Sequence, residues 1–177
     1  VYMVVEDLAN VNYANVLHVA PERELERYLK SKAANYLSID LYQPAMAKMD
    51  VTSLELEDES QSLIWISHVL EHVVDDGAAI AEMYRVLAKS GVASVQVPIW
   101  KYETYEDFTI TSPDKRISAF YQPDHVRLYG LDIVDRFDKV GFDAEVYRAQ
   151  DFGPEIMLKH GLSFASTNEV FVFRKPS

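Results

Sequence analysis

The sequence contains no cysteine and has few basic residues. The lack of cysteine excludes disulfide bonds and metal sites built on thiolates, although it hardly constrains the compartment. The 17 lysines and arginines are outnumbered by 28 aspartates and glutamates, which gives a formal net charge of -11. No dense basic cluster is present, so the composition argues against a nucleic-acid partner, which needs a basic face.

Long apolar runs and a recognisable signal peptide are also missing. A membrane-spanning helix needs about 20 consecutive, mainly apolar residues, so the sequence predicts no membrane partner and a cytoplasmic protein. A chain that begins at Val1 is compatible with a missing N-terminus. The sequence carries no signal for a particular oligomeric state.

Glycine is scarce, with only six in the whole chain. None of them lies in the turn between the first predicted strand, residues 16–19, and the helix that follows it. A nicotinamide cofactor normally requires a glycine-rich turn at this point, because the backbone must approach the phosphates closely. The sequence therefore argues against a nicotinamide-dependent enzyme.

The most informative part of the chain is residues 62–99. Residues 63–66 form a continuous apolar run, which is typical of a strand that is buried on both faces. Residues 77–89 carry apolar side chains at helical spacing, and Gly91 follows as a stop signal, so an amphipathic helix is predicted. Residues 92–97 are predicted to form a second strand. A strand, a helix and a strand in this order indicate a parallel pair joined by a right-handed crossover.

The rest of the chain continues this alternation of strands and helices. Its other predicted strands are residues 16–19, 36–39, 47–49, 142–147 and 169–174, with helices at about 21–32 and 133–140. The segments at about 98–124 and 151–168 are interpreted as insertions. A chain of 177 residues that is 49% hydrophobic suits one domain, so we expect a single doubly wound α/β domain over residues 1–177.

Two stretches resemble the class I S-adenosylmethionine-dependent methyltransferases, in particular the small-molecule members. They are MDVTSLELEDESQSLIWISHVLEHVVDDGAAIAEMYRVLAKSGVASVQVPI and, further on, DHVRLYGLDIVDRFDKVGF. The resemblance covers about residues 16–147 and the last strand, and the order and spacing of the motifs carry it. It implies an enzyme with a Rossmann-like, mostly parallel seven-stranded sheet whose last strand is antiparallel. It also implies S-adenosyl-L-methionine as the cofactor and a small-molecule methyl acceptor.

Two aspartates each end a short apolar strand. An acid at the position of Asp40 can accept hydrogen bonds from both hydroxyls of a ribose, although a helix cap or a solvated loop acid is the alternative. The resemblance implies that Asp50 binds the adenine amino group and that the backbone amide of Val51 binds a ring nitrogen; an ordinary turn residue is the alternative for Asp50. Leu41 and Ser67, which follow or end their strands, are further candidates for cofactor binding.

The first strand-to-helix turn departs from the family pattern of an acid followed by a glycine-rich turn. The stretch here is His18-Val19-Ala20-Pro21-Glu22. Ala20 still allows a close backbone approach, whereas Pro21 removes a hydrogen-bond donor. His18, Ala20 and Glu22 remain candidates for cofactor binding. Glu22 either attracts the positive charge of the cofactor or serves the first turn of its helix.

His68, Glu71 and His72 spell H-x-x-E-H, the inverted zinc-peptidase motif. A zinc site of that kind needs both histidines on one helix and a third ligand from elsewhere, whereas this motif straddles the predicted start of the helix. We therefore interpret the segment as a turn that lines a ligand site, without a metal, and keep a zinc hydrolase as a minor alternative. His68 is a candidate both for cofactor binding and for catalysis, while His72 could simply pack under the helix.

Candidates for the acceptor side follow the aromatic insertion. His125 and Arg127 alternate, so both can face one side of an extended segment. His125 is the second catalytic candidate because histidine titrates near neutrality. Arg127 is a candidate for binding an anionic or hydroxyl-bearing acceptor, and a local salt bridge with Asp124 or Asp132 is an equally good interpretation.

Aromatic side chains of the insertion form the last group of candidates. Trp100 and Tyr105 are predicted to bind the substrate as part of an apolar wall that covers the acceptor, although single aromatic residues are more often core residues. The main alternative function is a non-catalytic binding module that keeps the fold and has lost the cofactor. The glycine-poor first turn motivates this alternative.

Overall fold

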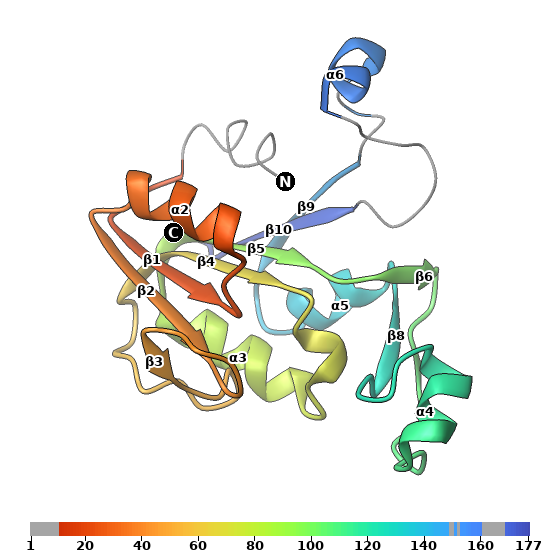
Figure 1. Cartoon of the computed structure of the whole chain (residues 1–177). Helices are drawn as coiled ribbons and strands as arrows, with labels where there is room; N and C mark the ends of the chain where they lie inside the picture. Colours follow the sequence, from red (N-terminus) through yellow and green to blue (C-terminus); the bar gives the residue numbers. More distant parts are fainter. Residues whose placement is uncertain (1–10, 149–150, 152, 161–168) are drawn as a thin grey trace.

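The computed structural model describes residues 11–148, 151, 153–160 and 169–177. They form a seven-stranded sheet of order β3-β2-β1-β4-β5-β10-β9 and a separate three-stranded sheet (Figure 1). No helix within these ranges combines the length and the apolar sequence that crossing a bilayer requires. The strands of the large sheet are β1 (Asn15–Val19), β2 (Asn35–Asp40), β3 (Ala47–Lys48), β4 (Gln61–Ser67), β5 (Leu87–Gln96), β9 (Asp143–Tyr147) and β10 (Val170–Arg174).

The strand directions confirm the predicted fold class. β1 lies between β2 and β4 and pairs parallel with both, and β4 pairs parallel with β5. β10, the last strand, pairs antiparallel with β5 and β9. All residues of β4 are buried, so this strand needs sheet neighbours on both sides and covered faces, as its continuous apolar sequence indicated.

Helices cover both faces of the large sheet (Figure 1). They are α2 (Arg23–Lys32), α3 (Asp76–Val86) and α5 (Ile133–Asp138), and a further helix, α6 (Gly153–His160), follows β9. The buried leucines of α2 pack with Trp65 of β4 on one face. On the opposite face, α3 and α5 share a second apolar cluster, in which the rings of Phe137 and Phe173 stack with centroids 3.6 Å apart. These layers fix the sheet on which the candidate site is built.

The boundary between α3 and β5 differs from the prediction. The sequence predicted a helix to Lys89 with Gly91 as its stop signal, but α3 ends at Val86 and β5 follows immediately. Ser90 has a positive φ of 60°, and Gly91 comes next within the strand. A Cβ atom on Gly91 would lie 2.7 Å from the carbonyl oxygen of Ala88, so this glycine is required by an irregularity in the strand and not by a helix end.

The aromatic segment at about 98–124 has secondary structure of its own. It contains β6 (Ile99–Lys101), β7 (Tyr105–Glu106) and α4 (Pro113–Phe120), and β8 (Arg127–Gly130) follows it. β8 pairs parallel with β6 and antiparallel with β7, which makes the small sheet of this lobe. The other predicted insertion, 151–168, lies partly outside the described residues.

Candidate functional site

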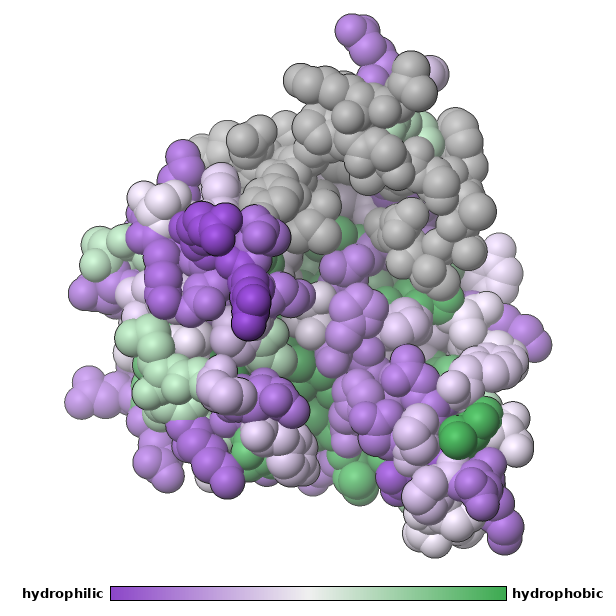
Figure 2. Space-filling model, viewed as in Figure 1, coloured by the Kyte–Doolittle hydropathy of each residue, from purple (hydrophilic) through white to green (hydrophobic). Residues whose placement is uncertain are grey.

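A cavity of about 720 Å³ lies at the carboxyl ends of β1, β2 and β4. Ala20 lines it from the turn after β1, Asp40 and Asp50 from the loops after β2 and β3, and His68 and His72 from the turn after β4. In Figure 2, hydrophobic surface is visible at the centre of this face and is bordered by hydrophilic side chains. Parallel sheets bind ligands at the carboxyl ends of their strands, so this cavity is the candidate functional site.

The turn after β1 has the backbone shape of a glycine turn without containing glycine. Ala20 has a φ of 51°, in the left-handed region, and its backbone N–H donates to the carbonyl oxygen of Ile39 over 2.8 Å. An alanine in this region costs about 1–2 kcal/mol that a glycine would not. Because the small side chain of Ala20 lines the cavity, the turn still lets the backbone approach a ligand.

His18 and Glu22, the other two candidates of this turn, pair with each other. Nε2 of the fully buried His18 lies 2.8 Å from Oε2 of Glu22, and its Nδ1 lies 2.9 Å from the hydroxyl of Tyr36. Burial raises the pKa of Glu22, but hydrogen bonds with His18, with its own backbone and with Ser67 together outweigh burial and leave this pKa below its ordinary value. Neither residue is among the described residues that line the cavity. Their contacts stabilise the turn and do not reach into the cavity.

Asp40 both stabilises its own loop and lines the cavity. Its Oδ1 accepts hydrogen bonds from the backbone N–H groups of Tyr42 and Gln43, both over 2.6 Å. Both bonds use the same oxygen, so within the described part of the chain Oδ2 remains available to a ligand. Leu41 lines the cavity beside it. The two interpretations of Asp40 from the sequence, a loop acid and a ligand-binding acid, are therefore compatible.

Asp50 is arranged in the same way. Its Oδ1 accepts from the backbone N–H and the hydroxyl of Thr52, over 2.9 and 2.8 Å. Val51 is buried and lines the cavity together with Asp50. Their role in cofactor binding stays a prediction. Ser67, by contrast, is buried at the end of β4 and is not among the described lining residues.

His68 and His72 belong to the turn that follows β4, which contains the short 3-10 helix η1 (Leu70–His72). His68 has a φ of 53° and an exposed ring, and its Nδ1 lies 3.3 Å from Oε1 of Glu71. The hydrogen bond with Glu71 raises the pKa of His68 above its usual value. Nδ1 of His72 lies 3.3 Å from Oδ2 of Asp124, which also lines the cavity. Both histidines therefore line the cavity, and each has one ring nitrogen next to a carboxylate.

His125 is placed behind this turn. It is 4% exposed, and its ring meets that of His72 edge to face, with centroids 4.7 Å apart. Burial lowers the pKa of His125, so its neutral form is favoured. Within the described part of the chain the cavity is lined by His72 and not by His125, which therefore contacts the wall of the cavity and not its interior.

Arg127 is fully buried and holds the same turn in place. Its guanidinium donates to the carbonyl oxygens of Leu70, Val73 and Val74, and it pairs with Glu106 over 2.9 Å. A side chain with these partners and 1% exposure does not reach an acceptor in the cavity.

The predicted alternative, a local salt bridge of Arg127 with Asp124 or Asp132, is also wrong. Asp124 pairs with His72, and Asp132 accepts hydrogen bonds from the backbone and hydroxyl of Thr104. The anionic partners of Arg127 come from β7 and from the start of α3.

Comparisons with known proteins agree with this architecture. A family model described as "Methyltransferase domain" matches residues 3–95, which is more than half of the 177 residues. The chain belongs to the methyltransferase domain family. Its resemblance to class I S-adenosylmethionine-dependent methyltransferases, and with it the predicted enzyme class and cofactor, is confirmed at the level of the family. No curated protein matches the sequence significantly.

Solved structures show the same fold at low sequence identity. The YcgJ protein from Bacillus subtilis is 13% identical to this methyltransferase, with a TM-score of 0.68 and coverage of 99% of this chain and 97% of that one. An S-adenosylmethionine-dependent methyltransferase from Mesorhizobium loti is 14% identical, with a TM-score of 0.67 and coverage of 93% and 92%. Phosphoethanolamine N-methyltransferase 2 from Haemonchus contortus, in complex with S-adenosyl-L-methionine, is 17% identical, with a TM-score of 0.66 and coverage of 99% and 53%.

The aromatic wall that the sequence predicted does not line the cavity of this methyltransferase. Trp100 and Tyr105 are partly exposed on the small lobe, and neither is among the described lining residues. The lobe contributes Arg116 and Asp124 instead. Sequence reasoning missed Asp124 as a site residue, and it treated His72 as a packing residue. The signal that could have found His72 is its place in the same turn as His68.

Proposed function

We propose that this methyltransferase transfers the methyl group of S-adenosylmethionine to a small-molecule acceptor. The observation that carries the proposal is that one cavity has carboxylates, Asp40 and Asp50, on one side and imidazoles, His68 and His72, on the other. Its volume of about 720 Å³ lies in the usual range of small-molecule sites, roughly 300–1,000 Å³. The net charge of -11 further disfavours a nucleic-acid acceptor.

The carboxylate side fits the nucleoside half of the cofactor. Asp40 keeps Oδ2 for a ribose hydroxyl while Oδ1 fixes the loop, and Asp50 is held with its carboxylate beside the buried Val51. Ala20 contributes a small side chain and a left-handed backbone where the family has glycine. The residues present therefore fit the cofactor, although the first turn contains no glycine.

The histidine side is where the acceptor would lie. When bound, S-adenosylmethionine supplies an electrophilic methyl group on its sulfonium. Most of the rate would come from holding the acceptor in line with this methyl group, which can remove about 7–11 kcal/mol of barrier. Where the acceptor must lose a proton, His68 would accept it on Nε2, since Nδ1 is held by Glu71. General base catalysis of this kind contributes about 10²–10⁴-fold.

The general base role is proposed for His68 alone. His125, the second catalytic candidate from the sequence, contacts His72 and is not among the described residues that line the cavity. A group that does not touch the acceptor cannot take its proton directly.

A turnover assay tests the proposed reaction. The purified protein is incubated with S-adenosylmethionine and separate pools of small amines and hydroxy compounds, of protein and of RNA, and S-adenosylhomocysteine is measured by mass spectrometry. Turnover with a small-molecule pool is expected. Turnover with the protein or RNA pool only would contradict the small-molecule acceptor, and calorimetry that shows no binding of S-adenosylhomocysteine would favour the non-catalytic binding module.

Single-turnover rates of two His68 variants test the base. His68→Ala is expected to lower the rate by about 10²-fold or more. His68→Asn keeps an N–H donor for Glu71 near the position of Nδ1, but its amide cannot act as a base. Its single-turnover rate should therefore fall as far as that of His68→Ala. A His68→Asn enzyme with nearly wild-type turnover, when folded and saturated with cofactor, would leave positioning as the sole contribution of this residue.

A further inference from the structure

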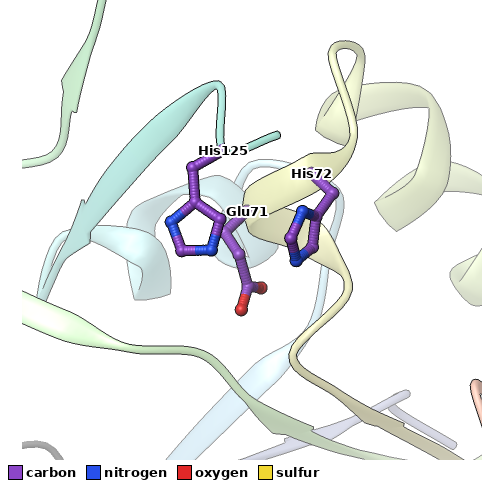
Figure 3. A group of neighbouring side chains, drawn as sticks. All are labelled: Glu71, His72 and His125. Atoms are coloured by element: carbon purple, nitrogen blue, oxygen red, sulfur yellow. The ribbon is translucent and has the colours of Figure 1, made fainter. Parts of the chain in front are cut away.

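Three side chains with metal-binding atoms meet in the wall of the cavity. Glu71, His72 and His125 each offer one ligand atom, and these atoms lie within 4.8 Å of one another. Figure 3 shows the carboxylate of Glu71 beside the rings of both histidines. Two of the residues belong to η1, and the third lies two positions before β8, more than fifty positions later in the chain.

Two members of this cluster, Glu71 and His125, each have a buried side-chain atom without a hydrogen-bond partner among the described residues. Glu71 is 2% exposed, and among the described residues its Oε2 has no hydrogen-bond partner. Its other oxygen, Oε1, is 3.3 Å from Nδ1 of the exposed His68. A buried carboxylate oxygen without a partner is costly, because its desolvation is not compensated. A cation bound beside Oε2 would remove this cost.

The surroundings orient His72 as metal ligands are commonly oriented. Its Nδ1 lies 3.3 Å from Oδ2 of Asp124, a position that favours the tautomer with the proton on Nδ1 and the lone pair on Nε2. A carboxylate on the far ring nitrogen fixes the tautomer and raises the basicity of the ligating nitrogen. The backbone also holds the cluster together, since the N–H of Val126 donates to the carbonyl oxygen of Glu71 over 2.9 Å.

We propose that Glu71, His72 and His125 bind a divalent transition-metal ion of the zinc type. Two imidazole nitrogens and one carboxylate oxygen form a donor set that suits zinc and leaves a position open. Ligand atoms around a tetrahedral zinc lie about 3.4 Å apart, so the widest pair of the cluster, which lies within 4.8 Å, would close by up to about 1.4 Å on binding. His72 and Asp124 line the cavity, so the ion would sit in the cavity wall. This inference does not depend on the proposed methyl transfer.

The site differs from the one that the H-x-x-E-H motif suggests. In that motif both histidines bind the metal, which here would be His68 and His72. The ring of His68 is 56% exposed on the cavity side. Its Nδ1 pairs with Oε1 of Glu71 and not with Oε2, the oxygen that has no partner among the described residues. The third ligand is instead His125, which no local sequence motif includes.

Zinc titration of the untagged protein tests the proposal. Calorimetry with zinc chloride, after treatment with a chelator, is expected to show one equivalent per wild-type chain. Zinc binding should be weakened at least about tenfold in each of three variants: Glu71→Gln, which keeps the size and shape of the side chain, His72→Ala and His125→Ala. His68→Asn is the matched control and should retain the wild-type affinity within a few-fold.

A second measurement separates loss of the site from loss of the fold. Zinc should raise the melting temperature of the wild-type protein and of His68→Asn, but not that of Glu71→Gln, whose circular dichroism should remain native. Absence of stoichiometric zinc binding by the wild type would overturn the proposal. So would a folded Glu71→Gln protein with wild-type affinity, or an equal loss of affinity in His68→Asn, which would point to the linear motif instead.

Discussion

The two sides of the cavity are built in different ways. On the carboxylate side, Asp40 binds the backbone two and three positions further on, and Asp50 binds Thr52, two positions further on. On the histidine side, Arg127 binds carbonyl groups that lie 53 to 57 positions earlier in the chain. The first side is made by local loops on a parallel sheet, whereas the second exists only when the small lobe docks against the turn after β4.

This difference predicts how each side responds to mutation. Removing a residue of the local side changes one loop and the ligand contacts of that loop. Removing a central residue of the long-range side leaves several buried groups of distant segments without partners, which costs more free energy. The three substitutions that follow compare the two sides, and a fourth, on the exposed face of α2, is a reference; they run from the largest expected effect to the smallest.

Arg127→Met should have the largest effect on stability. It removes the donor of the carbonyl oxygens of Val73 and Val74 and one donor each of Leu70 and Glu106, which keep the N–H of Val73 and the guanidinium of Arg136. A hydrogen bond from a charged donor contributes about 1.5–3 kcal/mol, so losing several of them together should cost about 3 kcal/mol or more. Urea denaturation followed by circular dichroism measures the free energy of unfolding. A loss below about 1 kcal/mol would mean that the lobe and the turn after β4 hold together without this residue.

Asp40→Ala should weaken binding of S-adenosylhomocysteine by about 1.5–3 kcal/mol, the usual contribution of hydrogen bonds to a charged group. Isothermal titration calorimetry measures this affinity. Asp40→Asn separates the two roles of the residue, because its amide oxygen can still accept from Tyr42 and Gln43. Asp143→Ala, on the exposed edge strand β9, is the control. Unchanged affinity in Asp40→Ala, with a wild-type protein that binds well, would remove the ribose role.

Ala20→Val tests the left-handed turn of the local side. A β-branched residue at a φ of 51° is strongly disfavoured, so unfolding free energy should fall by about 1–2 kcal/mol. Ala33→Val is the matched control, because Ala33 has an extended backbone with a φ of -74° and a ψ of 138°. Thermal denaturation compares the two variants. Equal effects would show that crowding, and not backbone conformation, decides the cost at position 20.

Arg27→Ala should have the smallest effect on the free energy of unfolding. It removes an exposed ion pair, with which the loss in Arg127→Met is compared. Arg27 pairs with Glu24 over 3.3 Å on the exposed face of α2, with both side chains at least three-quarters exposed. Exposed pairs contribute roughly 0–1 kcal/mol. The same urea experiment should therefore show a change well below that of Arg127→Met. A comparable loss would contradict the view that burial of the Arg127 network makes the difference.

Much of the local side could be predicted from the sequence. Asp40 and Asp50 were named because each ends a short apolar strand, and residues at the ends of neighbouring parallel strands come together at one edge. Val51 was named because the family resemblance implied it. The turn after β1 was harder to predict. Its lack of glycine suggested a weakened site, but Ala20 adopts the left-handed backbone at a cost of about 1–2 kcal/mol, which the surrounding fold can offset.

The sequence indicated the alternation of strands and helices in the large sheet and the acids at its carboxyl edge, and the family resemblance it carries implied the antiparallel last strand. Hydrophobic periodicity and strand ends are local properties, so they are readable along the chain. Only the tertiary structure decided that Arg127 is buried in a network, that Trp100 and Tyr105 lie away from the cavity, and that His125 meets His72. These contacts join segments about 50 positions apart, and a side chain's partners at that distance depend on how the small lobe packs on the sheet.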